Sequence, residues 1–124
     1  MEFETPQFQM TDEDLDDHTV VVSVRGEIHV TTAPEFSRRL NDVIASGRTL
    51  LVLDLLGVDF IDSTGLSVLL NGLRSVTRAD GRMAIAAANP TVLRLFEITK
   101  LDSTFDIHPT RDEALASVRG QAAA

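Results

Sequence analysis

The sequence predicts a single α/β domain over residues 1–124, with a mixed sheet whose core is mostly parallel. Its first strand is expected at an antiparallel N-terminal edge, and about four helices cover the sheet. Two observations support this prediction. Short apolar runs alternate along the chain with segments whose apolar residues recur every three or four positions, which is typical of parallel strands joined by helices. The first two predicted strands are separated by only a short turn, which favours a hairpin.

The domain is organised around residues 50–76. Residues 50–56 (LLVLDLL) predict a strand buried on both faces, and residues 57–61 predict a short connection. An apolar stripe then predicts a helix, and Asp62 and Ser63 stand where a side-chain oxygen can accept from its first amides. Because ligands of open α/β sheets bind outside the carboxyl ends of the strands, we expect Ser63 where partners meet the domain.

The other elements follow from the same patterns. Before the central stretch, the sequence predicts an edge strand at 7–14, a turn at 16–18, a strand at 19–25, a loop at 26–31, and a helix that opens with a capping box at 32–35 and stops at Gly47. After it come a turn at 79–81, a strand at 82–88, a helix from Pro90 to about Lys100 capped by Asn89, a strand at 105–107, and a helix opened by a second capping box at 110–113. The tail, 119–124, is expected to fray.

The net charge of −8 is concentrated at the N-terminus. Residues 1–17 hold seven acids and no base, whereas the remainder holds 12 acids and 11 bases. Such a chain should be repelled by nucleic acid and by anionic lipid. The acidic edge segment, residues 1–18, is interpreted as a solvated edge that aids solubility, with a basic protein partner as the alternative.

Composition also limits the compartment and the chemistry. The chain has no cysteine, so a disulfide framework and thiolate chemistry are excluded. No apolar run approaches the roughly 20 residues of a membrane span, and no leader is evident, so we expect a cytoplasmic protein without a membrane span. His18, His29 and His108 lack paired spacing, so no metal is expected. Glycine-rich phosphate loops are absent, so no nucleotide cofactor is expected.

Two groups of residues resemble functional sites of other proteins. Asp54 superficially resembles the phosphorylated aspartate of a receiver domain, but the acidic pair and the lysine that receivers need are missing, so we interpret it as a carboxylate that caps nearby backbone amides. Ser63, His29 and Asp54 could form a hydrolase triad at one sheet end, but the nucleophile elbow G-x-S-x-G is absent. We therefore predict that the protein is not an enzyme, and a serine hydrolase is the minor alternative.

Ser63 at a helix N-terminus is also suited to carry a phosphate, since free amides and the helix dipole both favour an anion there. The alternative is a plain N-cap serine, which stabilises a helix by about 1 kcal/mol. The surrounding sequence favours the first interpretation. Its distinctive parts are residues 25–28, 32–33, 53–55, 58–66 (VDFIDSTGL), 89–96 and Leu101. With these motifs the chain resembles the STAS-domain family of anti-sigma factor antagonists over roughly residues 19–118.

The resemblance implies that Ser63 is phosphorylated by a cognate serine kinase that is also the anti-sigma factor. The unphosphorylated protein then binds the anti-sigma factor and frees the sigma factor, and a serine phosphatase restores it. The kinase supplies the ATP site, so no cofactor is expected here. Family members commonly carry an acidic residue where this chain has His29. This difference is expected to affect either the efficiency with which Ser63 is phosphorylated or the identity of the kinase that recognises it.

The predicted partner-binding surface comprises His29, Thr31, Asp62, Ser63, Thr64, Gly65, Ser67, Asn71 and Arg74. A second function class stays open, in which the protein is a non-phosphorylated STAS adaptor subunit of a transport or signalling complex.

Overall fold

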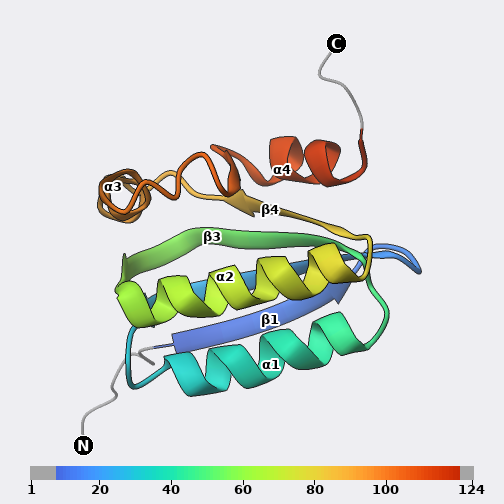
Figure 1. Ribbon diagram of the computed structural model, residues 1–124, viewed down its shortest axis with the longest axis horizontal. Helices are drawn as coiled ribbons and strands as arrows, with labels where there is room; N and C mark the ends of the chain where they lie inside the picture. The colour runs from blue at the N-terminus through green and yellow to red at the C-terminus, as the bar shows by residue number, and fades with distance from the viewer. Residues whose placement is uncertain (1–7, 121–124) are drawn as a thin grey trace, which may run out of the picture.

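The computed structural model describes residues 8–120, which form five strands and four helices in the predicted order. The elements are β1 (Phe8–Asp14), β2 (Thr19–Ile28), α1 (Ala33–Ala45), β3 (Leu50–Ile61), α2 (Ser63–Arg78), β4 (Arg82–Ala86), α3 (Pro90–Ile98), β5 (Asp106–His108) and α4 (Arg111–Val118). The strands lie side by side in the order β1-β2-β3-β4-β5, with β1 antiparallel to β2 and the others parallel (Figure 1). The predicted mixed sheet is confirmed.

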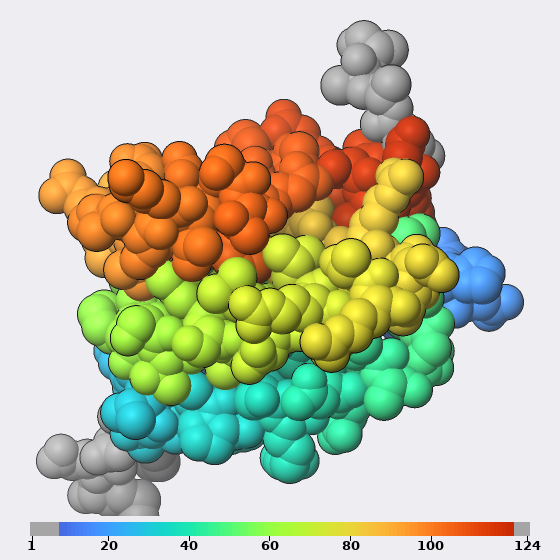
Figure 2. Space-filling model, in the orientation of Figure 1, coloured from blue at the N-terminus to red at the C-terminus, as the bar shows by residue number. Residues whose placement is uncertain are grey.

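Helices cover the two faces of the sheet unequally. Side chains alternate along a strand, so Val20, Val22 and Val24 of β2 join the main core with α1, α2 and α3, whereas Val21 faces the other side. On that second side, α4 is the one helix among residues 8–120, and it packs against β3, β4 and β5. Figures 1 and 2 show α1 and α2 lying side by side, with both helices beginning at the same end of the molecule. Within residues 8–120, no helix has the length and apolar character needed to cross a membrane.

Two strands run further than the sequence predicts. The expected loop at 26–31 is wrong at its start, because β2 continues to Ile28, and the expected connection at 57–61 is strand, because β3 continues to Ile61. The pairing of β2 with β3 shifts twice, so β3 carries extra residues at two β-bulges. At the first, the backbone N–H of Leu56 donates to Asp54 Oδ1 at 3.0 Å. Beyond the first bulge Gly57 pairs with Arg25, and beyond the second Ile28 pairs with Ile61.

The helix boundaries follow the capping signals. Asn89 accepts from the amide of Thr91 at 2.8 Å, and Thr110 accepts from that of Glu113 at 3.1 Å, so both predicted N-caps are confirmed. The first helix ends at Ala45, and Gly47 follows with φ +96°, as its predicted stop requires. Three other predicted bounds need small corrections. The strand expected at 82–88 ends at 86, the helix expected to end near Lys100 ends at 98, and the strand expected at 105–107 lies at 106–108.

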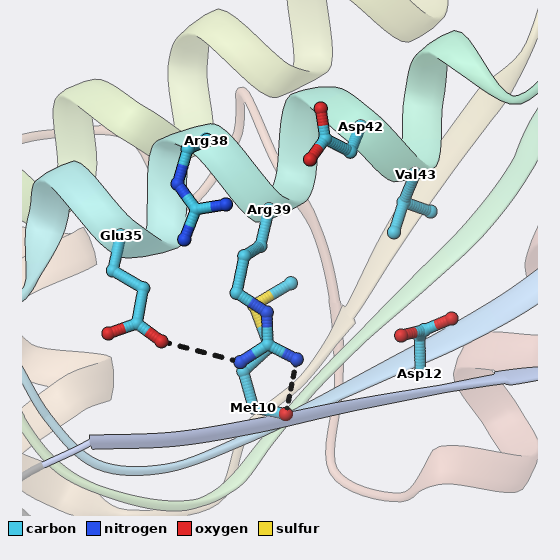
Figure 3. Close-up of a pocket in the computed structure, with 7 residues that line it drawn as sticks. All are labelled: Met10, Asp12, Glu35, Arg38, Arg39, Asp42 and Val43. Carbon is cyan, nitrogen blue, oxygen red and sulfur yellow. Dashed lines mark hydrogen bonds and ion pairs between the residues drawn. The ribbon is translucent and has the colours of Figure 1, made fainter.

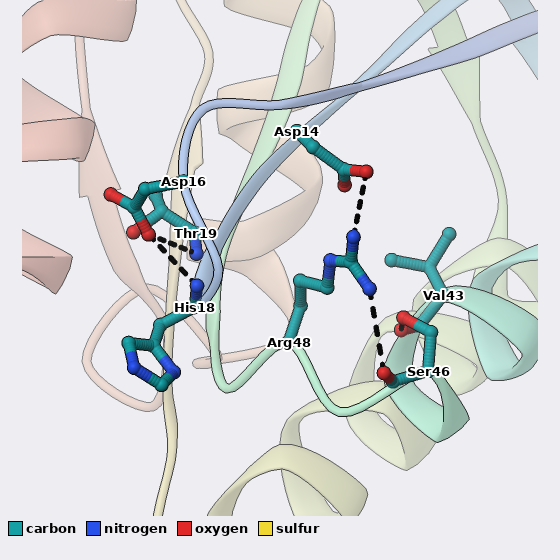
Figure 4. A network of polar contacts seen from close by, with 7 residues as sticks. All are labelled: Asp14, Asp16, His18, Thr19, Val43, Ser46 and Arg48. Carbon is teal, nitrogen blue, oxygen red and sulfur yellow. Dashed lines mark hydrogen bonds and ion pairs between the residues drawn. The ribbon is translucent and has the colours of Figure 1, made fainter.

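The acidic N-terminal region is partly neutralised by arginines of the same chain. Asp16 accepts from the amides of His18 and Thr19 at 2.8 Å each in the predicted turn, and Arg48 contacts Asp14 at 2.8 Å (Figure 4). Two arginines of the C-terminal region complete the set, with Arg111 on Glu13 and Arg119 on Asp16, both at 3.2 Å. The described part of the acidic segment is therefore tied to its own domain.

These contacts also correct the predicted tail. Arg119 and Gly120 are hydrogen-bonded to the last turn of α4, so the expected fraying does not begin at 119. Residues 121–124, like residues 1–7, lie outside the described residues.

A carbonyl group of the edge strand β1 is occupied by an arginine of α1. Arg39 donates through Nη2 to the carbonyl oxygen of Met10 at 2.8 Å and contacts Glu35 at 3.5 Å through Nη1 (Figure 3). Arg38 and Asp42 line the adjoining cavity of about 510 Å³. A charged side chain on an edge carbonyl blocks the pairing of another strand there, so this contact protects the sheet edge.

Candidate functional site

The start of α2 presents Ser63 to the surface. Asp62 occupies the N-cap in extended conformation, and its Oδ1 accepts from the amide of Gly65 at 3.0 Å. Ser63, the first helical residue, and Thr64 are both exposed. Within the described chain their two amides have no acceptor, because the carbonyls that would serve them lie before the helix. Of the two residues expected at the helix entry, Asp62 is the N-cap, so the alternative of Ser63 as a plain N-cap serine is wrong. Ser63 stands one position further, beside two free donors.

Gly65 fixes the position of this helix start. A Cβ at Gly65 would lie 2.7 Å from Ile28 Cγ2 and from Ile61 Cγ1, and 3.0 Å from the carbonyl oxygen of Ile28. The same carbonyl accepts from the amide of Asp62 at 3.1 Å. Gly65 was predicted among the partner contacts, but it is buried, so its contribution is the close approach of α2 to the ends of β2 and β3.

The loop between β2 and α1 is held by Thr32. The sequence predicts a capping box at 32–35, but Thr32 makes no side-chain cap on α1. Its hydroxyl instead donates to the carbonyl oxygen of Glu27 at 2.8 Å and accepts from the amide of His29 at 3.0 Å. Thr32 therefore joins the two ends of the loop by hydrogen bonds. The loop stands beside the start of α2 because Ile28 pairs with Ile61.

His29 is oriented by its neighbours in this loop. Its Nε2 lies 3.3 Å from Glu27 Oε1, and its Nδ1 accepts from the amide of Thr31 at 3.2 Å. A neutral imidazole protonated on Nε2 satisfies both contacts. Only 17% of the His29 side chain is exposed, so the ring is an oriented part of the loop, whereas Thr31 lies at the surface.

The polar stripe of α2 lies at the surface as predicted. Ser67, Asn71 and Arg74 are all exposed. Ser67 donates to the carbonyl oxygen of Ser63 at 3.1 Å, and Arg74 contacts Asn71 Oδ1 at 3.5 Å. Of the nine residues predicted for the partner surface, six are exposed, namely Thr31, Ser63, Thr64, Ser67, Asn71 and Arg74; His29 and Asp62 are half-buried, and Gly65 is buried.

Sequence reasoning missed one apolar residue at this end of the domain. Val30, between His29 and Thr31, has 68% of its surface exposed. The available signal was a branched apolar side chain inside an otherwise polar loop. A large apolar side chain held out at a surface of polar groups has the character of an anchor for a partner.

The residues of the minor hydrolase hypothesis have other partners. Asp54 accepts from the amide of Leu56, as its interpretation as a backbone cap predicts, and it lies on the second face of the sheet. His29 contacts Glu27, and no hydrogen bond joins it to Ser63 or Asp54 in residues 8–120. Over the same range, no three acidic or histidine side chains cluster as a metal site would require.

A family model described as the STAS domain matches residues 10–114. The chain belongs to the STAS domain family. This STAS domain is 32% identical over 100 residues to the anti-sigma-F factor antagonist RsfB of Mycobacterium tuberculosis, with 81% of each chain covered. A crystal structure of an anti-sigma factor antagonist from Mycobacterium paratuberculosis superimposes with a TM-score of 0.84 at 36% identity, covering 94% of this chain and 99% of that one. The unphosphorylated form of the anti-sigma factor antagonist SpoIIAA superimposes with a TM-score of 0.77 at 25% identity, covering 90% and 97%.

Proposed function

We propose that this STAS domain is an anti-sigma factor antagonist that is switched at Ser63. The unphosphorylated form binds an anti-sigma factor that is also a serine kinase, and so releases a sigma factor. Phosphorylation of Ser63 ends this binding, and a serine phosphatase restores it. Relatives and similar structures that are named as anti-sigma factor antagonists support the regulatory role. The observation that carries the proposal is the exposed Ser63 at the first position of α2, inside the D-S-T-G sequence.

The start of α2 suits a phosphate without a change of fold. A phosphoserine carries about −1.5 to −2 charges and three acceptor oxygens. The amides of Ser63 and Thr64 and the positive end of the helix dipole favour such an anion. Gly65 keeps the helix start seated on Ile28 and Ile61, so the modification changes the surface and leaves the core in place.

The switch then acts at the interface. A phosphate on Ser63 would keep a partner from packing closely on Thr31, Ser67 and Asn71, and it would repel the partner's acids. A loss of about 3–4 kcal/mol lowers affinity several-hundredfold, which is enough for a switch. The proposal needs no catalytic residue in this chain, because the kinase supplies the ATP site, the phosphate chemistry and the specificity for Ser63.

The remaining assignments belong to the same proposal. Residues 1–124 act as one domain in the cytoplasm, without nucleic acid, metal or cofactor. His29 stands where family members commonly carry an acid, and its contact with Glu27 places a carboxylate of the last residues of β2 beside it. We infer that Glu27 supplies the acidic character that the kinase meets beside Ser63.

A non-phosphorylated adaptor in a transport or signalling complex is the second candidate, since the same surface could bind a subunit permanently. A neighbouring gene for a histidine-kinase-like ATPase favours the switch, and neighbouring transporter genes favour the adaptor.

A binding measurement tests the switch directly. We expect Ser63→Ala to bind the anti-sigma factor as tightly as the wild type, and Ser63→Asp to bind at least tenfold more weakly. Ser103→Asp is the matched control, because it adds the same charge at an exposed position in the loop between α3 and β5. Equal affinity for Ser63→Asp and Ser103→Asp would refute a switch at Ser63.

A further inference from the structure

Among residues 8–120, one helix covers the second face of the sheet, and it leaves parts of β1, β2 and β3 uncovered. On this side α4 packs against β3, β4 and β5. Beside it lies a cavity of about 540 Å³, lined by Gln9, Thr11, Ser23, Arg25, Asp54 and Leu56 among others. This volume falls within the range of about 300–1,000 Å³ that is typical of small-molecule sites. The cavity is on the opposite side of the sheet from the core that α2 covers.

The strand register sets these side chains in two rows. Thr11 pairs with Ser23 and Ser23 with Asp54, so three polar side chains cross β1, β2 and β3 in one row. In the next row Gln9 pairs with Arg25 and Arg25 with Gly57. Since alternate residues of a strand share a face, both rows face the cavity. The cavity floor is therefore a compact grid of hydrogen-bonding groups.

Arg25 is held along this floor with its guanidinium unpaired. A Cβ at position 57 would lie 2.9 Å from Arg25 Cγ and 3.4 Å from its Nε, so the absence of a side chain at Gly57 makes room for the arginine. Within residues 8–120, Arg25 has no acid within 4.0 Å and no side-chain hydrogen bond. Its N–H groups are thus available to an anionic ligand group, which a guanidinium can bind in bidentate fashion.

Asp54 supplies the opposite charge. Its Oδ1 accepts from the amide of Leu56, which leaves its other oxygen for a ligand. Arg25 and Asp54 are the charged residues of the cavity lining. They stand on neighbouring strands one row apart, on the two sides of the first β-bulge. The two charges do not form an ion pair, and a small molecule can lie between them.

We propose that this cavity binds a small zwitterion, a compound of the amino-acid class with one carboxylate and one protonated amine. The carboxylate pairs with Arg25 and the amine with Asp54, while Ser23 and Thr11 hydrogen-bond the remaining polar atoms. Leu56, with 42% of its surface exposed, covers an apolar part of the ligand. The site is independent of the proposed switch, because it uses none of the residues around Ser63.

Amide chemical-shift titrations of the full chain test the proposal. The probes are glycine and 4-aminobutyrate as zwitterions of two lengths, with acetate and methylammonium as single charges. We expect at least one zwitterion to shift the amides of β1, β2 and β3 around the cavity at concentrations up to about 10 mM, and each single charge to bind at least tenfold more weakly. No shift from either zwitterion would overturn the proposal, and so would acetate binding with equal affinity.

Variants assign the contacts. Asp54→Asn keeps an oxygen for the Leu56 amide and removes the charge, and Arg25→Gln removes the guanidinium. Each should weaken zwitterion binding at least fivefold, whereas Arg94→Gln, an exposed arginine of α3, should leave it unchanged. Unchanged binding in Arg25→Gln would overturn the proposal even if Asp54→Asn failed to fold. Concentration-dependent shifts of the same amides without any probe would identify a second copy of the chain as the occupant, and would overturn it as well.

Discussion

Replacing Gly65 by alanine should loosen the start of α2, because three atoms already occupy the space of the new methyl group. The added Cβ would lie 2.7 Å from a methyl group of Ile28 and from a methylene group of Ile61, and 3.0 Å from a backbone oxygen. Carbon atoms pack favourably at about 3.5–4.0 Å, so the helix start has to move outward by about 1 Å. That movement strains the hydrogen bond from the Asp62 amide to the Ile28 carbonyl.

The expected cost follows from two opposing effects. Overpacking a core costs about 1–3 kcal/mol, whereas alanine in place of glycine favours a helix by up to about 1 kcal/mol. The free energy of unfolding should therefore fall by about 1–2 kcal/mol, which lowers Tm by several degrees for a domain of this size. Because α2 carries Ser63, affinity for the anti-sigma factor should fall as well.

Gly72→Ala is the matched control within the same helix. Its Cβ would lie 3.0 Å from Leu40 Cδ2, the end of a flexible side chain, and its next contact is at 3.8 Å. Here the gain in helix propensity should offset the repacking, so stability should be unchanged or slightly raised. Urea unfolding followed by circular dichroism compares the two variants. If Gly65→Ala were as stable as Gly72→Ala, the close approach at Gly65 would not be what seats α2.

Three further predictions concern the cap, the acidic turn and the partner surface. Asp62→Ala removes the acceptor for the third amide of α2 and should lower the free energy of unfolding by about 1 kcal/mol in urea titrations. The amide of His18 is the main cause that lowers the pKa of Asp16 below its ordinary value of 3.8, with further hydrogen bonds from Thr19 and Arg119. The ionised Asp16 therefore stabilises the fold above pH 3.8, and this contribution is lost as the pH falls through the lowered pKa, so Asp16→Asn should flatten the pH dependence of unfolding in that acid range. Val30→Ser should weaken binding to the anti-sigma factor by about tenfold with unchanged Tm, whereas Ile98→Ser, which alters an equally exposed apolar residue of α3, should not; equal effects in calorimetric titrations would exclude Val30 as an anchor.

The order of the elements could be predicted because local patterns decide it. The apolar run at 50–56, the stripe after Ser63 and the caps at Asn89 and Thr110 all agree with the final packing. The ends of β2 and β3 could not be predicted, because Gly26 and Gly57 are local signals for a turn. Pairing between the two strands outweighs those signals. The extra residues of β3 are accommodated at two β-bulges, and at the first of them Asp54 accepts from the amide of Leu56.

In the candidate site, too, local patterns predict some features and tertiary packing decides others. The exposed stripe of Ser67, Asn71 and Arg74 follows from helical spacing alone. The role of Thr32 does not, since its hydroxyl could equally have capped α1, and only the turn at His29 directs it to Glu27. Burial of Gly65 likewise depends on how closely α2 approaches the sheet, which is a property of the assembled core.

The most direct test of the switch at Ser63 is the intact mass of the protein after incubation with ATP and the candidate kinase that a neighbouring gene encodes. The account predicts one added phosphate on the wild type, none on Ser63→Ala, and one on Thr64→Ala, which changes only the adjacent exposed hydroxyl. Phosphate that persists on Ser63→Ala would contradict the assignment of the site. An unmodified wild type, with the kinase active on another substrate, would contradict this kinase as the partner and favour the adaptor.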